Sequence, residues 1–202
     1  MNHLTLPEIK DFNALGDASR LKFSEKCFRG GSSRKSSWDG LVLYHLSREM
    51  PEDHWEVEAL YDLCFAPGRE ALSSYRLRDG ADPVSALCRV ARDGDGILAG
   101  AIRFWPIRVG GAPALLLGPV AVHPTRQGEG LGGALINDSV GRAAENGWAR
   151  VALVGDAPYY RRFGFARLEG VIMPPPTNPE RVLGTGDWQG ITGPVTAWAA
   201  PK

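Results

Sequence analysis

The sequence predicts an α/β fold of the α+β kind, with helices flanking a mixed but mostly antiparallel central sheet. Apolar runs of strand length are separated by turn signals, as at residues 86–109, where Asp93-Gly94-Asp95-Gly96 divides two runs. Apolar positions at helical spacing lie at 55–65 and 134–144. A chain of 202 residues, 44% hydrophobic and 23% charged, can bury the core that such a sheet needs.

The composition also limits the kinds of binding partner and the cellular compartment to be expected. The formal net charge is zero and the pI is about 6.9, so nothing indicates binding to nucleic acid or to an anionic membrane. No apolar run reaches the length of a membrane span, and the N-terminus has no apolar signal core. Cys27, Cys64 and Cys88 are far apart and form no CxxC pair, which indicates reduced thiols and a cytoplasmic protein. No metal site is expected.

Residues 1–40 differ in character from the rest of the chain. A capping-box pattern at residues 5–8 predicts a short helix, and the Gly- and Ser-rich segment at 30–37 is typical of a flexible linker. We therefore expect an N-terminal arm and linker at 1–40 and one domain at 41–202.

The first half of the domain contains strands and helices in alternation. The expected elements are a strand at 41–46, a helix from Pro51 to Pro67, a shorter helix at 71–78, strands at 86–92 and 97–109, and a strand ending at Val122. Gly100 and Pro106 lie inside the long strand, so a bend or bulge is expected there.

The second half begins with a helix that stops at Asn146-Gly147, a normal C-terminal signal. It continues with a buried strand at 151–154, a short helix from Pro158 to Gly164, a strand at 165–171, an irregular connector at 173–179 and a closing edge strand at 192–198.

The stretch from Gly118 to Gly133 carries the strongest chemical signal. An apolar strand ends at His123-Pro124, a glycine-rich turn follows, and a helix begins after it. The first turn of a helix has unpaired N–H groups and the positive end of the macrodipole, and glycines allow a ligand to approach these groups closely. The pattern therefore predicts a phosphate or pyrophosphate site.

The same glycines fit a second interpretation. Gly128-x-Gly130-x-x-Gly133 matches the dinucleotide fingerprint, and Asp156 follows the next strand, at about the distance of a ribose-binding acid. In that fold, however, the first glycine directly follows the strand, whereas residues 123–127 intervene here. The fingerprint also normally begins a parallel unit, and this one follows a series of hairpins.

Gln127-x-x-Gly130-x-Gly132 resembles the acyl-CoA pyrophosphate loop of GNAT-type N-acetyltransferases, and residues 120–124 resemble their splayed central strand. Downstream, Gly155-Asp156 and the Tyr-Tyr-x-x-Phe-Gly-Phe block at 159–165 are similar to their next strand and tyrosine-bearing helix. The sequence of these two motifs is most similar to that of the YhbS-like branch of predicted bacterial acetyltransferases. The resemblance implies a GNAT-like sheet in which the central strand splays from its neighbour.

The resemblance also implies acetyl-CoA as the co-substrate. It places the cofactor-binding positions at Val120, Ala121, Val122, Gln127, Gly128, Glu129, Gly130, Leu131, Gly132 and Gly133. The backbone of Val120 and Val122 would hold the pantetheine arm like an added strand and offer an N–H to the thioester oxygen. Arg126 is a candidate charge partner for the pyrophosphate.

Tyr160 occupies the position that matches the family's proton donor to the leaving sulfur, four residues before Gly164. A thiol pKa of about 8.5 makes the sulfur a fair leaving group, so a donor should contribute no more than about 10²–10⁴-fold. The alternative is that Tyr160 only packs and Tyr159 points to the ligand. Phe163 and Phe165 are expected in the core.

No general base is evident, because residues 115–122 contain no acid. His123 is the nearest titratable group, although it is more simply a solvent-facing strand end. Asp156 is the other candidate, although a turn-forming cap is the simpler role. The lack of an evident general base favours an acceptor amine of low pKa, or removal of the amine proton through water.

Three functions follow from these patterns. The favoured one is an N-acetyltransferase that moves an acetyl group from acetyl-CoA directly to an amine of a small molecule or peptide. A CoA-binding regulatory or sensor domain without catalysis and a nucleotide-dependent oxidoreductase are the alternatives. The formation of a homodimer is left open, and the sequence does not predict the identity of the acceptor amine.

Overall fold

The computed structural model of the chain describes residues 43–65, 68–71 and 74–198. The arm expected at 1–40 lies outside these residues, so the division into an arm and a domain at 41–202 stays a prediction.

Nine strands form the framework of the described chain. They are β1 (His45–Arg48), β2 (Arg89–Arg92), β3 (Leu98–Val109), β4 (Ala112–Val122), β5 (Arg150–Val154), β6 (Ala166–Arg167), β7 (Val171–Ile172), β8 (Val182–Gly186) and β9 (Gly193–Ala197). The helices are α1 (His54–Phe65), α2 (Leu131–Glu145) and α3 (Ala157–Tyr160), with short 3-10 turns η1 (Pro51–Asp53), η2 (Arg69–Ala71), η3 (Tyr75–Arg78), η4 (Pro124–Arg126), η5 (Arg161–Phe163) and η6 (Pro179–Arg181).

The sheet is mixed and mostly antiparallel, which confirms the predicted fold class. Its main order is β1-β2-β3-β4-β5-β8-β6, and β9 pairs with both β3 and β7. Parallel pairing occurs between β4 and β5 and between β7 and β9. The β4–β5 ladder covers only Leu115–Val151 and Leu116–Ala152, so the rest of β4 diverges from β5 as the predicted splayed strand.

The long β3–β4 hairpin turns at Gly110 and Gly111, whose φ angles of 55° and 89° suit glycine. The register shift within this pair falls between Ile102 and Phe104. In the β2–β3 pair the register shifts beside Gly100, because Gly100 pairs with Ala91 while Leu98 pairs with Arg92. The irregularity expected at Gly100 is therefore confirmed, and neither shift falls at Pro106.

Pro106 pairs with Leu115 of β4. On its other side it lies in a gap, because the pairing of β2 with β3 reaches only Ile102 and the pairing of β9 begins at Ile107.

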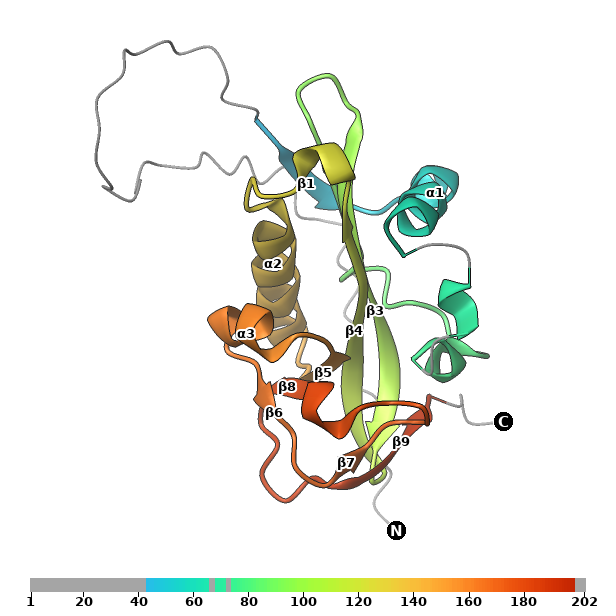
Figure 1. Ribbon diagram of the computed structural model, residues 1–202, viewed down its shortest axis with the longest axis vertical. Coiled ribbons are helices and arrows are strands. Elements are labelled where there is room, and N and C mark those ends of the chain that lie inside the picture. The colour runs from blue at the N-terminus through green and yellow to red at the C-terminus, as the bar shows by residue number, and fades with distance from the viewer. Residues whose placement is uncertain (1–42, 66–67, 72–73, 199–202) are drawn as a thin grey trace, which may run out of the picture.

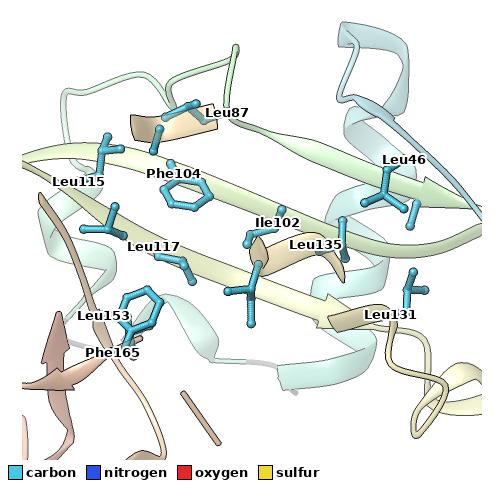
Figure 2. Close-up of a cluster of buried hydrophobic side chains, with 14 of the residues drawn as sticks. Leu46, Leu87, Ile102, Phe104, Leu115, Leu117, Leu131, Leu135, Leu153 and Phe165 are labelled. Atoms are coloured by element: carbon cyan, nitrogen blue, oxygen red, sulfur yellow. The ribbon is translucent and has the colours of Figure 1, made fainter. Parts of the chain in front are cut away.

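Helices cover both faces of this sheet. Figure 1 shows α2 and α3 on one side of β3 and β4, and α1 on the other. Between α2 and the sheet lies a buried cluster that includes Ile102, Phe104 and Leu135 (Figure 2). A second cluster joins α1 to the sheet through Val57 and Leu60, among others. Each fully buried large apolar side chain contributes about 1.5–3 kcal/mol, so these clusters fix both helices on the strands.

The C-terminal third departs from the prediction in two places. The strand expected at 165–171 is two short strands, β6 and β7. The strand β8 was not predicted, because only Val182 and Leu183 in it are apolar and its pairing with β5 and β6 is a tertiary property. Earlier in the chain, the short helix expected at 71–78 is replaced by the two 3-10 turns η2 and η3.

Candidate active site

The glycine-rich stretch has the predicted order of strand, turn and helix. After β4, the η4 turn leads through Gln127 to Gly130, which is the N-cap of α2 with φ 82°. No side chain caps α2 at Gly130, so the first N–H groups of the helix have no side-chain acceptor there. A Cβ on Gly128 or Gly130 would meet nothing within 4 Å. The loop thus presents backbone donors on an open surface.

The charged side chains around this loop are already engaged with the protein. Arg126 forms an ion pair with the buried Asp93 at 3.0 Å. The Tyr44 hydroxyl donates to the Glu129 carboxylate. Because Arg126 already has a carboxylate partner, backbone groups rather than a free cation are the main anion-binding feature of the loop.

The divergence of β4 from β5 opens a cleft of about 140 Å³, here called the splay cleft. Its lining includes Gly118, Pro119 and Val120 of β4, Val154 of β5 and Tyr160 of α3. On its other edge β4 pairs with β3 at Leu117 and Val120, on either side of the register shift. An extended ligand can therefore pair with the free edge in the manner of an added strand.

The two adjacent tyrosines of α3 lie in different places. Tyr160 lines the splay cleft, and its ring is so close to Gly155 that a Cβ there would be 2.3 Å from Cε2. The Tyr159 hydroxyl instead lies beside the first turn of α2, 3.0 Å from the position of a Cβ on Gly132. Burial, followed by the charge of Tyr159, raises the pKa of Tyr160 to about 12. Tyr160 is therefore protonated at neutral pH.

Neither residue weighed as a base has a dedicated partner that would activate it. His123 Nδ1 lies 2.8 Å from Thr125 Oγ1 and accepts from the Thr125 N–H at 3.3 Å, so its ring caps the turn after β4. Asp156 precedes α3 as its N-cap, is exposed, and makes no side-chain cap hydrogen bond.

A larger pocket of about 760 Å³, here called the α1 pocket, adjoins the splay cleft. Both share Tyr75, Arg78 and Pro119 in their linings. The pocket also takes side chains from β1, α1, η2 and β3. Sequence reasoning predicted none of these side chains individually, because the segments are far apart in the chain and share no motif.

Two buried arginines of the α1 pocket are saturated by carboxylates. Arg103 donates to Glu49 at 2.6–3.0 Å and to Glu58, and Arg69 donates to Asp62 at 2.7 Å and to Glu58. Burial opposes ionisation of Glu58, but hydrogen bonds from Arg103 and Arg69 outweigh it and lower its pKa. Glu58 is therefore an ionised structural group and a poor general base.

Gly155 is a further residue that sequence reasoning did not assign. Any side chain at this position would overlap the ring of Tyr160 and also meet Leu153 Cδ1 at 2.8 Å. A glycine between a buried strand and a proline-initiated helix was the available signal, and here it provides the space that orients Tyr160.

Comparison with known proteins identifies the family. A model of the GNAT acetyltransferase domain matches residues 85–167. The N-acetyltransferase YhbS of Escherichia coli strain K12 is 34% identical over 119 residues, which cover 58% of this chain and 70% of YhbS. The chain belongs to the GNAT N-acetyltransferase family. The predicted family and enzyme class are thereby confirmed, and the acyl-CoA interpretation of the glycine pattern is favoured over the dinucleotide one.

Solved structures of GNAT proteins confirm the fold as well. The crystal structure of YhbS from Escherichia coli in complex with CoA has a TM-score of 0.68 and 27% identity, covering 81% of this chain and 94% of that one. A GNAT family acetyltransferase from Brucella melitensis in complex with acetyl-CoA has a TM-score of 0.58 and 30% identity, covering 77% and 96%.

Across residues 43–65, 68–71 and 74–198, no three or more His, Cys, Asp or Glu side chains gather in a way that could hold a metal ion. In the same described segments, no helix is both long and apolar enough to cross a membrane.

Proposed function

We propose that the enzyme transfers an acetyl group from acetyl-CoA directly to the amine of a small molecule or peptide. The observation that carries the proposal is one continuous arrangement. The free edge of β4 and Tyr160 line the splay cleft. The end of β4 leads through the glycine loop to the uncapped start of α2. In the transfer, the amine nitrogen forms a bond to the acetyl carbon while the carbon–sulfur bond breaks. The nitrogen loses a proton and the sulfur gains one.

The donor would be held by backbone groups of β4 and the loop. The proposed positions are Val120, Ala121, Val122, Gln127, Gly128, Glu129, Gly130, Leu131, Gly132 and Gly133. The open space at Gly128 and Gly130 and the start of α2 suit a pyrophosphate. The CoA and acetyl-CoA complexes of the YhbS and Brucella melitensis relatives support the same donor.

Gln127 organises this loop from within. Its side-chain amide donates to the carbonyl of Val122 at 3.2 Å, which joins the end of β4 to the turn before α2. Its contribution to the donor site is therefore its backbone and this bracing contact.

Tyr160 is proposed to protonate the leaving thiolate. It lines the splay cleft opposite the free edge of β4, and its high pKa keeps the hydroxyl proton in place until the sulfur develops charge. Protonation of a thiolate is worth at most about 10²–10⁴-fold, since the thiolate also leaves unaided.

Removal of the amine proton has no dedicated carboxylate in this proposal. Of the four acids that line the α1 pocket, Glu49 and Glu58 are held by arginines, whereas Glu70 and Asp79 are exposed. An acceptor that is substantially neutral near pH 8, such as an α-amine, would need little help, and water at the open pocket can carry its proton.

The enzyme is proposed to be located in the cytoplasm of a bacterium. The relatives named above are bacterial, and Cys64 and Cys88 are free thiols in the described chain. A homodimer stays a prediction. A CoA-binding sensor is the alternative function, although no contact in the described chain favours it.

An acceptor screen tests the proposal. Acetyl-CoA, but not NAD, should raise the melting temperature, and thiol release from acetyl-CoA should accelerate with at least one class in a panel of amines. Stabilisation by acetyl-CoA without acceleration by any amine would favour the sensor. Stabilisation by NAD alone would overturn the proposed donor.

A further inference from the structure

Five arginines line the α1 pocket. Two of them are exposed and use neutral acceptors, since Arg48 donates to Ser85 Oγ at 3.1 Å and Arg76 donates to the carbonyl of Pro175.

The other three differ in their partners. Arg69 and Arg103 are each held by two carboxylates. Arg78 lines the same pocket but forms no ion pair with any carboxylate in the described part of the chain. Two acids of the lining, Glu70 and Asp79, are exposed and do not pair with it.

Arg78 is held in place by aromatic rings. Its guanidinium carbon lies 3.8 Å from the centroid of the Tyr75 ring and 5.5 Å from that of Trp105. Its Nη2 lies 4.0 Å from the position that a Cβ on Gly118 would take. Because Gly118 is one of the β4 residues that line the splay cleft, and Arg78 lines both the cleft and the α1 pocket, the guanidinium lies at their junction.

Two donor atoms at this junction lack acceptors. Nε of Arg78 and Nε1 of Trp105 are both buried without a hydrogen-bond partner in the described structure. Burial lowers the pKa of Arg78, although the neighbouring Tyr75 opposes the shift. A cation that has lost water without gaining an anion is unfavourable, so an anionic group bound here would recover stabilisation.

We propose that the acceptor amine also carries a carboxylate, and that Arg78 binds this carboxylate while the amine lies at the splay cleft. The planar fork of a guanidinium matches a carboxylate in a bidentate manner, and stacking between rings fixes its orientation. The substrate class is therefore amino acids and short peptides with a free carboxylate. The inference rests on the proposed acetyl transfer, whose acceptor it specifies.

A carboxylate on the acyl group of the donor is the other source of the same chemistry. The sizes favour the acceptor, because the α1 pocket of about 760 Å³ has room for an amino acid or short peptide beside Arg78. A comparison of acetyl-CoA with succinyl-CoA on an uncharged amine separates the two sources.

The first experiment measures turnover of matched acceptors. Amino acids are compared with their carboxamides, which have the same side chain and amine but no carboxylate. We expect the acids to have the higher kcat/KM by about 10- to 100-fold, the range of a hydrogen-bonded charged contact. Since the amine of a carboxamide loses its proton more easily, intrinsic reactivity would give the opposite order.

Variants of Arg78 locate the effect. Arg78→Gln should abolish the preference for acids, and Arg78→Lys should retain part of it. Arg108→Gln is the matched control, because Arg108 stacks on Trp198 at 4.2 Å outside the α1 pocket. Its preference should equal that of the wild type. Melting temperatures of all variants check the fold.

A binding measurement keeps the inference testable if no acceptor is turned over. In the presence of CoA, calorimetry with N-acetyl amino acids and N-acetyl amino acid amides should show tighter binding of the acids, lost in Arg78→Gln. Equal binding of the two series, an unchanged preference in Arg78→Gln, or a preference for succinyl-CoA would overturn the inference. Acetylation of carboxamides alone would overturn it while leaving the proposed function intact.

Discussion

The glycine loop and the α1 pocket are built on different principles. The loop that leads into α2 is a single run of sequence, and the groups proposed to bind the donor belong to its backbone. The α1 pocket is assembled from side chains of six or more separate elements, held by ion pairs between Arg69, Arg103, Glu49 and Glu58. Only the first kind of site leaves a contiguous signature in the sequence.

The difference separates what is general from what is particular in the enzyme. A backbone cradle needs small residues at fixed spacing and recognises the same phosphate chemistry wherever it occurs. A pocket of paired side chains can vary position by position, because each charge is balanced locally. The donor side is therefore expected to tolerate few substitutions, and the acceptor side to decide specificity.

The largest expected effect is on the donor side. Gly132→Glu would add a negative charge at the start of α2, where a Cβ would lie 3.0 Å from the Tyr159 hydroxyl and 3.5 Å from Val122 Cγ2. We expect acetyl-CoA affinity to fall at least ~100-fold, because the carboxylate repels and obstructs the pyrophosphate. Calorimetry measures the affinity.

Gly141→Glu is the matched control for this change. Gly141 is in the same helix, nine residues later and about 13 Å along the axis, and a Cβ there would meet nothing within 4 Å. Its affinity should equal that of the wild type. If Gly132→Glu binds acetyl-CoA normally while folded, the loop is not the pyrophosphate site.

The same contrast explains how much the sequence could predict. The glycine turn and the short helix that begins at Pro158 follow local rules and could be predicted from the residues themselves. The splay of the central strand and the role of Tyr160 were expected only from the resemblance to GNAT-type acetyltransferases. The strand β8 could not be predicted, because Gly184 and its neighbours give no alternating pattern and are ordered by β5 and β6. Whether Arg78 forms an ion pair could not be predicted from the sequence for the same reason, because it depends on which carboxylates of other elements lie close to it.

An intermediate effect is expected for the proposed proton donor. Tyr160→Phe removes the hydroxyl but keeps the ring that packs over Gly155. Turnover should fall by about 10²-fold, while acetyl-CoA affinity stays near wild type. The loss should shrink with an acyl donor whose thiol leaves more easily. Steady-state kinetics with a confirmed acceptor give kcat and KM separately.

Tyr159→Phe is the control that sharpens the comparison within α3. The Tyr159 hydroxyl lies by the α2 turn rather than in the splay cleft, so its loss should alter donor affinity more than turnover. If Tyr159→Phe carries the fall in turnover instead, the donor role belongs to Tyr159. If neither change alters turnover, both tyrosines are structural.

The smallest effect is expected in the pH profile of turnover. An exposed tyrosine loses its proton around pH 10, but burial raises the pKa of Tyr160 to about 12. Because the protonated form is the uncharged one, a raised pKa keeps the hydroxyl proton at every pH below about 12. Turnover should therefore rise with pH as the acceptor amine loses its proton, and then stay level to about pH 10. A decline near pH 9–10 that is absent in Tyr160→Phe would mean that Tyr160 ionises early, in a cleft much wetter than its burial implies.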